Sequence, residues 1–117
     1  MSEETLSPDR RTRVEWAIST GRMSHEICSP RISDAKSGEI ILDLWTGDSW
    51  DASVKWTSDH VMHLRIRHYI EGGTTVLNVA IDRAAGTFRI DDGPPQPIAT
   101  MQRKIRPAFW RKAKAKS

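Results

Sequence analysis

The chain has 117 residues, of which 38% are hydrophobic and 28% are charged, and this composition is typical of one globular domain rather than a disordered chain. No apolar run is long enough to span a bilayer, and the acidic start of the chain lacks the apolar segment of a secretory signal. The single cysteine, Cys28, excludes an internal disulfide and every zinc site built on paired cysteines, so we expect a cytoplasmic protein with no transmembrane segment.

The positive charge is concentrated at the C-terminal end of the chain. Residues 101–117 hold seven of the eighteen bases and no acid, whereas residues 1–100 hold the other eleven bases and all fifteen acids. The net charge of +3 therefore divides into a body of −4 and a tail of +7. We expect an N-terminal arm over residues 1–12, a single β domain over 13–100 and a basic tail over 101–117 that is either partly helical or disordered.

Alternation of apolar and polar residues, closed by glycine turns, predicts short antiparallel strands through the β domain. The first strand is expected over residues 13–20. Ser7 and Pro8 also fit the first positions of a helix over residues 8–18, but the alternation of Val14 with the apolar residues that follow it favours a strand.

Four hairpins are predicted, each by a register that sets apolar residues opposite apolar residues. In the first, a type II′ turn at Gly21 pairs Trp16 with Ile27 and Ile18 with His25. This register places His25 on the apolar face of the sheet.

The second hairpin covers residues 40–56 and has two candidate registers. An even loop places Asp43 on the buried face, whereas an odd loop pairs Leu44 with Ala52. We prefer the odd loop, which leaves Trp45 on the outer face.

The third and fourth hairpins share a central strand. The third turns at the two glycines of EGGT, both of which can adopt a positive φ, and it pairs His68 with Leu77 and His63 with Asp82. The fourth turns at DRAAGT, pairs Asp82 with Thr87 and continues the same apolar face. About seven or eight short antiparallel strands in sequence order predict an all-β fold, either a small up-and-down β-barrel or a curved sandwich.

Three of the four histidines lie within the nine residues HVMHLRIRH. Strand parity separates them, because His63 and His68 point to opposite faces and His60 lies in a turn, whereas metal ligands converge to about 2 Å from one ion. We therefore expect no metal and no cofactor. His63 is expected to form a surface ion pair with Asp82. His25 and His68 lie on apolar rows, either as hydrogen-bonded residues near strand ends or as polar groups in a ligand-binding lumen.

Two sets of residues are candidates for binding. The lumen candidates are His25, His68, Trp16 and Trp56. The outer Trp45 and the basic, aromatic tail form a second set, since bases interleaved with aromatic rings suit contact with a protein, a nucleic acid or an anionic surface. Its members are Trp45, Arg103, Lys104, Arg106, Phe109, Trp110, Arg111 and Lys112.

Two stretches, RRTRVEW and GEIILDL…ASVKW, resemble parts of PilZ domains, which are small β-barrels that bind a cyclic dinucleotide. The two binding motifs of that family, RxxxR and [D/N]xSxxG, are not matched. Arg10, Arg11 and Arg13 have a different spacing, and Ser33 and Ala35 occupy the defining positions of the second motif. No binding residue is therefore carried over from the family.

No catalytic motif of the GxSxG, Walker A, HExxH or GxGxxG type is present. The sequence therefore favours a non-enzymatic β-module that binds a protein or polyanionic partner through its basic aromatic C-terminal tail. The alternative is a small-ligand carrier or enzyme that uses the lumen. Exposed strand edges also leave open a homodimer formed by strand pairing.

Overall fold

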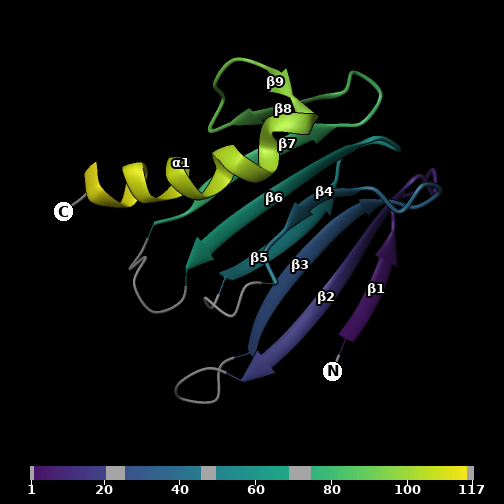
Figure 1. Cartoon of the computed structure of the whole chain (residues 1–117), viewed down its shortest axis with the longest axis horizontal. Helices are drawn as coiled ribbons and strands as arrows, with labels where there is room; N and C mark the ends of the chain where they lie inside the picture. The colour runs from purple at the N-terminus through teal and green to yellow at the C-terminus, as the bar shows by residue number, and fades with distance from the viewer. Residues whose placement is uncertain (1, 21–25, 46–49, 69–74, 116–117) are drawn as a thin grey trace.

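Two antiparallel sheets and one C-terminal helix make up the part of the chain that the computed structural model describes, residues 2–20, 26–45, 50–68 and 75–115 (Figure 1). The four-stranded sheet consists of β1 (Ser2–Leu6), β2 (Thr12–Thr20), β3 (Glu26–Asp34) and β4 (Ile40–Asp43). The five-stranded sheet consists of β5 (Trp50–Trp56), β6 (Val61–His68), β7 (Leu77–Asp82), β8 (Thr87–Ile90) and β9 (Gln96–Pro97). A short 3-10 helix, Ile98–Thr100, leads into α1 (Met101–Ala115).

Consecutive strands pair with one another except at the step from β4 to β5, where the chain passes from one sheet to the other, so the all-β class is confirmed and the arrangement of the sheets is sandwich-like. The strands that the structure describes do not close into a barrel. The strand expected over residues 13–20 is confirmed as β2, and part of the expected N-terminal arm forms β1, which pairs with β2. In the part of the chain that the structure describes, no helix is both long and apolar enough to cross a membrane.

The fourth predicted hairpin is confirmed in every register pair. Asp82 lies opposite Thr87 and Ile81 opposite Phe88. Gly86 has a φ of 71°, in the left-handed region where a residue without a Cβ avoids a steric clash.

The third hairpin has the predicted faces but a register that differs by two residues. Leu77 lies opposite Ile66 rather than His68. Because side-chain direction alternates along a strand, a shift of two residues changes the partners and keeps every side chain on its face. The predicted turn falls in residues 69–74, outside the described residues.

The predicted register of the first hairpin is wrong by three residues. Trp16 lies opposite Pro30 rather than Ile27. The observed register instead sets Val14 opposite Ile32, and both side chains are fully buried. Burial of this pair determines the register, whereas the prediction relied on a type II′ turn at Gly21, which lies outside the described residues.

The second predicted hairpin is wrong, because β4 pairs with β3 and β5 pairs with β6. β4 covers only the C-terminal half of the long strand β3, and the start of β5 lies beside the other half. There the carboxylate of Asp51 accepts a hydrogen bond from the backbone N–H of Cys28 at 2.8 Å, and the Ser29 hydroxyl donates to the carbonyl of Trp50 at 2.5 Å. Hydrogen bonds between side chains and main chain thus join the sheets where a closed barrel would have a strand ladder.

A second polar link joins the sheets at the turns after β3 and β7. Arg83 donates to the Thr12 hydroxyl at 3.0 Å and forms an ion pair with Asp34. The other carboxylate oxygen of Asp34 accepts hydrogen bonds from the backbone N–H groups of Ser37 and Lys36 at 2.8 and 2.9 Å. The Ser37 bond is the main cause that lowers the pKa of Asp34 to about 2, with further contributions from Lys36 and Arg83.

The C-terminal segment, expected to be partly helical or disordered, is helical over Met101–Ala115. Met101, Ile105 and Phe109 recur every four residues, which places them on one face of α1, and all three are fully buried. They belong to one core cluster with residues of both sheets. The helix (yellow-green to yellow in Figure 1) is therefore part of the folded domain.

A candidate binding groove along the C-terminal helix

The side of α1 that carries its exposed arginines forms one wall of a surface groove. Arg103 and Arg111 are both exposed and lie two helical turns apart. Between them, the helix and the segment around β8 and β9 enclose a hollow of about 420 Å³. We call this hollow the α1 groove, and its lining residues are Ile90, Gln96, Arg103, Lys104, Pro107 and Arg111.

Two lysines of α1, Lys104 and Lys112, differ from these arginines because each has a partner within the fold. Lys104 donates to the side-chain oxygen of Gln96 at 2.7 Å. Lys112 forms an ion pair with Asp91 at 2.8 Å and donates to the carbonyl of Val76 at 2.5 Å. Burial alone raises the pKa of Asp91, but the hydrogen bonds from Lys112 and from a backbone N–H outweigh it and lower the pKa overall. Lys112 therefore attaches the end of α1 to the five-stranded sheet.

Among the described residues, no carboxylate lies within ion-pair distance of Arg103 or Arg111. Arg106 is half-buried, and its buried Nε atom has no hydrogen-bond partner among the residues that the structure describes. The two exposed arginines are thus the bases of the α1 groove that remain available to an anionic partner.

Two further candidates from the tail, Phe109 and Trp110, pack into an aromatic cluster with Trp50 and His68. The ring centroids of Trp50 lie 5.0 Å from those of His68 and Phe109 and 5.7 Å from that of Trp110. Phe109 is fully buried and Trp110 is half-buried. Edge-to-face contacts of this kind stabilise an aromatic pair by about 0.5–1.5 kcal/mol beyond the area that it buries. The two rings of the tail therefore hold α1 against the sheet.

The lumen candidates do not surround a described hollow. His68 is 7% exposed and packs between Trp50 and Trp110. Trp16 and Trp56 are half-buried against the core cluster, and His25 lies outside the described residues. The hollows of about 150, 290, 410 and 420 Å³ on the described surface are lined by other residues.

Trp45, the expected outer contact residue, is half-buried and in contact with two neighbours on β3. Its Nε1–H donates to the carbonyl of Ser29 at 2.7 Å. The guanidinium carbon of Arg31 lies 3.8 Å from its ring centroid, a cation–π contact. Both the edge and one face of the indole therefore serve intramolecular contacts.

The expected cross-strand pair of His63 and Asp82 is wrong. Lys55 and Ala80 lie opposite His63 on the two neighbouring strands. The error follows from the shift of two residues in the register of β6 and β7, because a cross-strand pair depends on the partner and not only on the face.

Comparison of the chain with protein-family models, with curated proteins and with solved structures gives no significant match.

The sequence predicted the basic residues of the α1 groove from composition alone. It missed Ile90 and Gln96, because only the packing of α1 against the sheet brings β8 and β9 beside the helix.

Proposed function

We propose that the protein is a non-enzymatic binding module that docks an acidic segment of a partner protein in the α1 groove. The observation that carries this proposal is the pair of exposed arginines, Arg103 and Arg111, on one wall of a hollow of about 420 Å³. Neither has a carboxylate partner among the described residues. Guanidinium groups bind carboxylates in a bidentate geometry, which suits an acidic peptide.

The apolar residues of the groove favour a peptide as the ligand rather than an anionic polymer without apolar groups. Ile90 and Pro107 lie among the basic residues that line the hollow. A peptide can place an apolar side chain there between its carboxylates, whereas a phosphate backbone has no apolar group to bury. Arginines at the rim increase the association rate and the specificity more than the affinity. Because an exposed ion pair contributes about 0.2–1 kcal/mol, we expect weak and salt-sensitive binding.

The fixed position of α1 supports the same proposal. The aromatic cluster and the ion pair of Lys112 with Asp91 attach both the middle and the end of the helix to the sheet. A helix held in this way presents its arginines at a constant separation, so a partner does not have to order it on binding.

The test is fluorescence anisotropy with a labelled glutamate-rich peptide that also contains leucine. We expect the double variant Arg103→Glu with Arg111→Glu to bind at least about tenfold more weakly than the unmodified protein. Arg11→Glu with Lys36→Glu is the matched control, because these exposed bases lie in turns of the four-stranded sheet and their reversal changes the net charge equally. Equal losses in the two double variants would reject the groove as the docking site.

A further inference from the structure

A second basic surface lies on the outer face of the five-stranded sheet. Side chains alternate along each strand, so the residues between the buried positions of β5, β6, β7 and β8 point away from the core. The observed registers align them in rows across the sheet. We call this surface the basic sheet face, and its members are Ser53, Lys55, His63, Arg65, Arg67, Asn78 and Arg89.

The rows bring together bases that are far apart in the sequence. One row runs from Lys55 through His63 and Ala80 to Arg89, and the next contains Arg65. Neighbouring strands lie about 4.8 Å apart, and alternate residues of a strand lie about 6.7 Å apart. Four or five cationic or hydrogen-bonding side chains therefore lie within roughly 15 Å of one another.

Few acids offset the charge of the basic sheet face. Asp51 is paired with Arg67 through hydrogen bonds of 3.1 Å, and Arg67 is still 57% exposed. Asp82, at the edge of the face, accepts two backbone N–H groups of the following turn. In the described residues, no carboxylate lies within ion-pair distance of Lys55 or Arg65.

The outer face of the four-stranded sheet lacks this excess of positive charge. There Arg13 pairs with Glu4 and Arg31 with Asp43, each at 3.4 Å. The difference between the two sheets is one of charge compensation, since both faces contain arginine. Of the two outer sheet faces, as far as the structure describes them, the basic sheet face is the one with arginine and lysine side chains that no carboxylate neutralises.

Two neighbouring hollows occupy the basic sheet face. The larger has a volume of about 410 Å³ and contains His63 and Asn78 in its lining, and the smaller has a volume of about 150 Å³ and contains Arg67. Ser53 and Arg65 line both. Hydroxyl, amide and imidazole groups thus lie between the bases, where they can reach a ligand that is held by its charge.

We propose that the basic sheet face binds single-stranded nucleic acid without sequence preference. Lysine and arginine side chains across several strands can neutralise consecutive phosphates of one backbone. Nucleobases that are not paired in a duplex can turn towards the sheet, stack on the ring of His63 and form hydrogen bonds with Ser53 and Asn78. In a duplex the bases are paired and face inwards, so these central groups would have no ligand.

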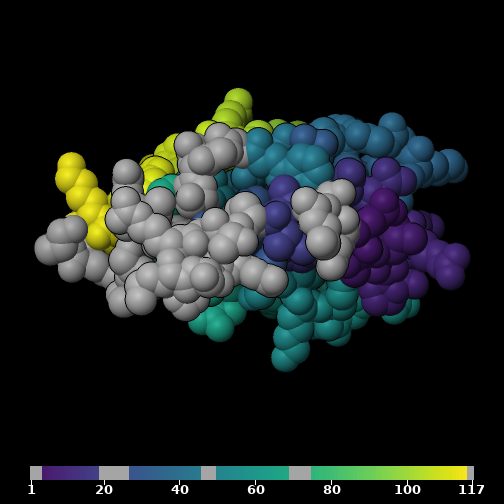
Figure 2. Space-filling model, turned by 90° about the horizontal axis from the view of Figure 1, so that it is seen from below, coloured from purple at the N-terminus to yellow at the C-terminus, as the bar shows by residue number. Residues whose placement is uncertain are grey.

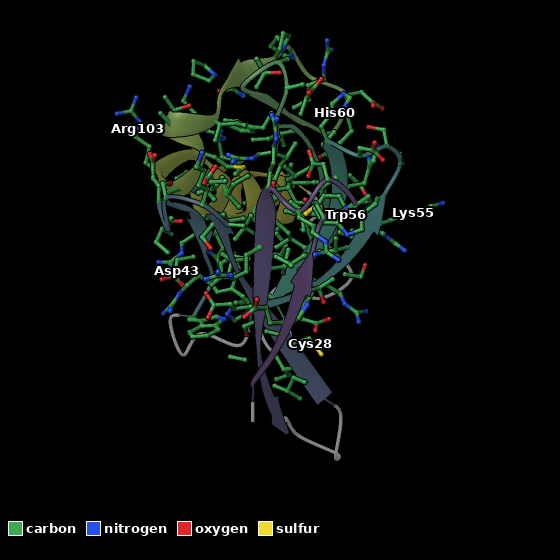
Figure 3. All side chains as sticks on the ribbon, turned by 90° about the vertical axis from the view of Figure 1, so that its right-hand side faces the viewer. Cys28, Asp43, Lys55, Trp56, His60 and Arg103 are labelled. Carbon is green, nitrogen blue, oxygen red and sulfur yellow. The ribbon has the colours of Figure 1, made fainter. Side chains whose placement is uncertain are left out.

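This site is separate from the α1 groove. Figure 3 shows the labelled Lys55 and Arg103 projecting on opposite sides of the molecule. In Figure 2, side chains of the teal segment that contains β5 and β6 project on the side away from the yellow-green start of α1. The two proposals can therefore be tested, and can fail, independently.

The experiment measures binding of a labelled oligothymidylate of about 20 nucleotides. We expect the double variant Lys55→Gln with Arg65→Gln to weaken binding by at least about fivefold at low salt. With three basic residues that lack a carboxylate partner, Lys55, Arg65 and Arg89, the slope of log affinity against log salt should be about −2, and it should flatten to about −0.7 in this variant. The matched control, Arg103→Gln with Arg111→Gln, should keep the affinity within about twofold.

Three outcomes would overturn the proposal. Equal weakening in the two double variants would show that the whole charge of the protein attracts the oligonucleotide. Equal affinity for a duplex of the same length would contradict the preference for single strands, and no measurable binding would contradict the site itself. Thermal unfolding of every variant checks the fold. Arg89→Gln, on a different strand, gives a second variant that should reduce the salt slope by about 0.7.

Discussion

Asp51 is 8% exposed, although its position in β5 places it on the outer side of the sheet. It is covered because β3 lies beside it, and one carboxylate oxygen accepts the N–H of Cys28. The other oxygen accepts two hydrogen bonds from Arg67. The Asp51 carboxylate thus accepts a backbone N–H of the four-stranded sheet and holds an arginine of the five-stranded sheet.

Replacement of this carboxylate should destabilise the junction of the sheets. We expect Asp51→Ala to lower the free energy of unfolding by about 1–3 kcal/mol, since it removes the carboxylate that accepts from the Cys28 N–H and from Arg67 at the junction of the sheets. Arg67→Ala should cost about 1 kcal/mol or less, because its side chain is 57% exposed and water replaces the lost contact. Urea unfolding measures both values, and an equal cost for the two variants would contradict this assignment.

Asp34 should give the stability of the protein a dependence on acid pH. Its pKa is lowered to about 2 from 3.8, so the ionised group stabilises the folded state above pH 4 and this contribution is lost as the pH falls towards 2. We expect the difference in urea midpoint between the protein and Asp34→Asn to be largest near about pH 5 and to shrink towards about pH 2. A difference that stayed constant across this range would contradict the assignment.

At the scale of elements, α1 completes the core, and Phe109 is its most distal buried residue. Phe109→Ala should lower the free energy of unfolding by about 3–5 kcal/mol through lost burial and the cavity left behind. Arg103→Ala, on the exposed side of the same helix, should change it by no more than about 0.5 kcal/mol. Thermal or urea unfolding compares them, and similar values would show that the helix is not docked as described.

This role of α1 determines how the tail can be studied. A chain ending at Arg106 would lose a fully buried phenylalanine together with the arginine at position 111. Loss of binding in such a truncation would report the loss of folding as well as of contact. Charge substitutions on the exposed side of α1 separate the two effects.

Local patterns in the sequence predicted the faces of strands better than their partners. The hydrophobic alternation of β6, β7 and β8 identifies the buried side of each strand, because this period is a property of a few consecutive residues. The turn at Gly86 also fixed a register, since four residues of known turn chemistry leave little freedom. The assignment of β4 and β5 to different sheets depends on the contacts that both make with β3, and the Asp51 carboxylate of β5 contacts a residue of β3 more than twenty positions away in the chain. A pattern of a few consecutive residues does not contain this information.

The two proposed binding surfaces differ in the same way in how far the sequence predicts them. Arg103 and Arg111 are conspicuous in a tail without acids, so composition alone marks them. The bases of the basic sheet face come from strands that each look unexceptional, and only their registers bring Lys55 beside His63 and Ala80 beside Arg89. A surface assembled across strands is therefore harder to predict than one that follows a single helix.

At the scale of the whole molecule, the positions of the two surfaces predict independent binding. Because they lie on opposite sides (Figure 3), an acidic peptide and an oligonucleotide should occupy the protein together. We expect the affinity for the labelled peptide to change by less than about twofold in the presence of saturating oligothymidylate. Competition measured by anisotropy would indicate instead that one surface binds both ligands.

The place of α1 after the nine strands that the structure describes has a consequence for synthesis on the ribosome. Every strand pairs with a neighbour in the chain, so both sheets can form as soon as their residues emerge. Their inner faces nevertheless remain incompletely covered until Met101, Ile105 and Phe109 have followed. At roughly 5–20 residues per second, the fifteen residues of α1 take about 1–3 s to translate. During this interval the nascent chain exposes apolar surface that a chaperone can recognise, and translation pauses within the helix should increase its aggregation.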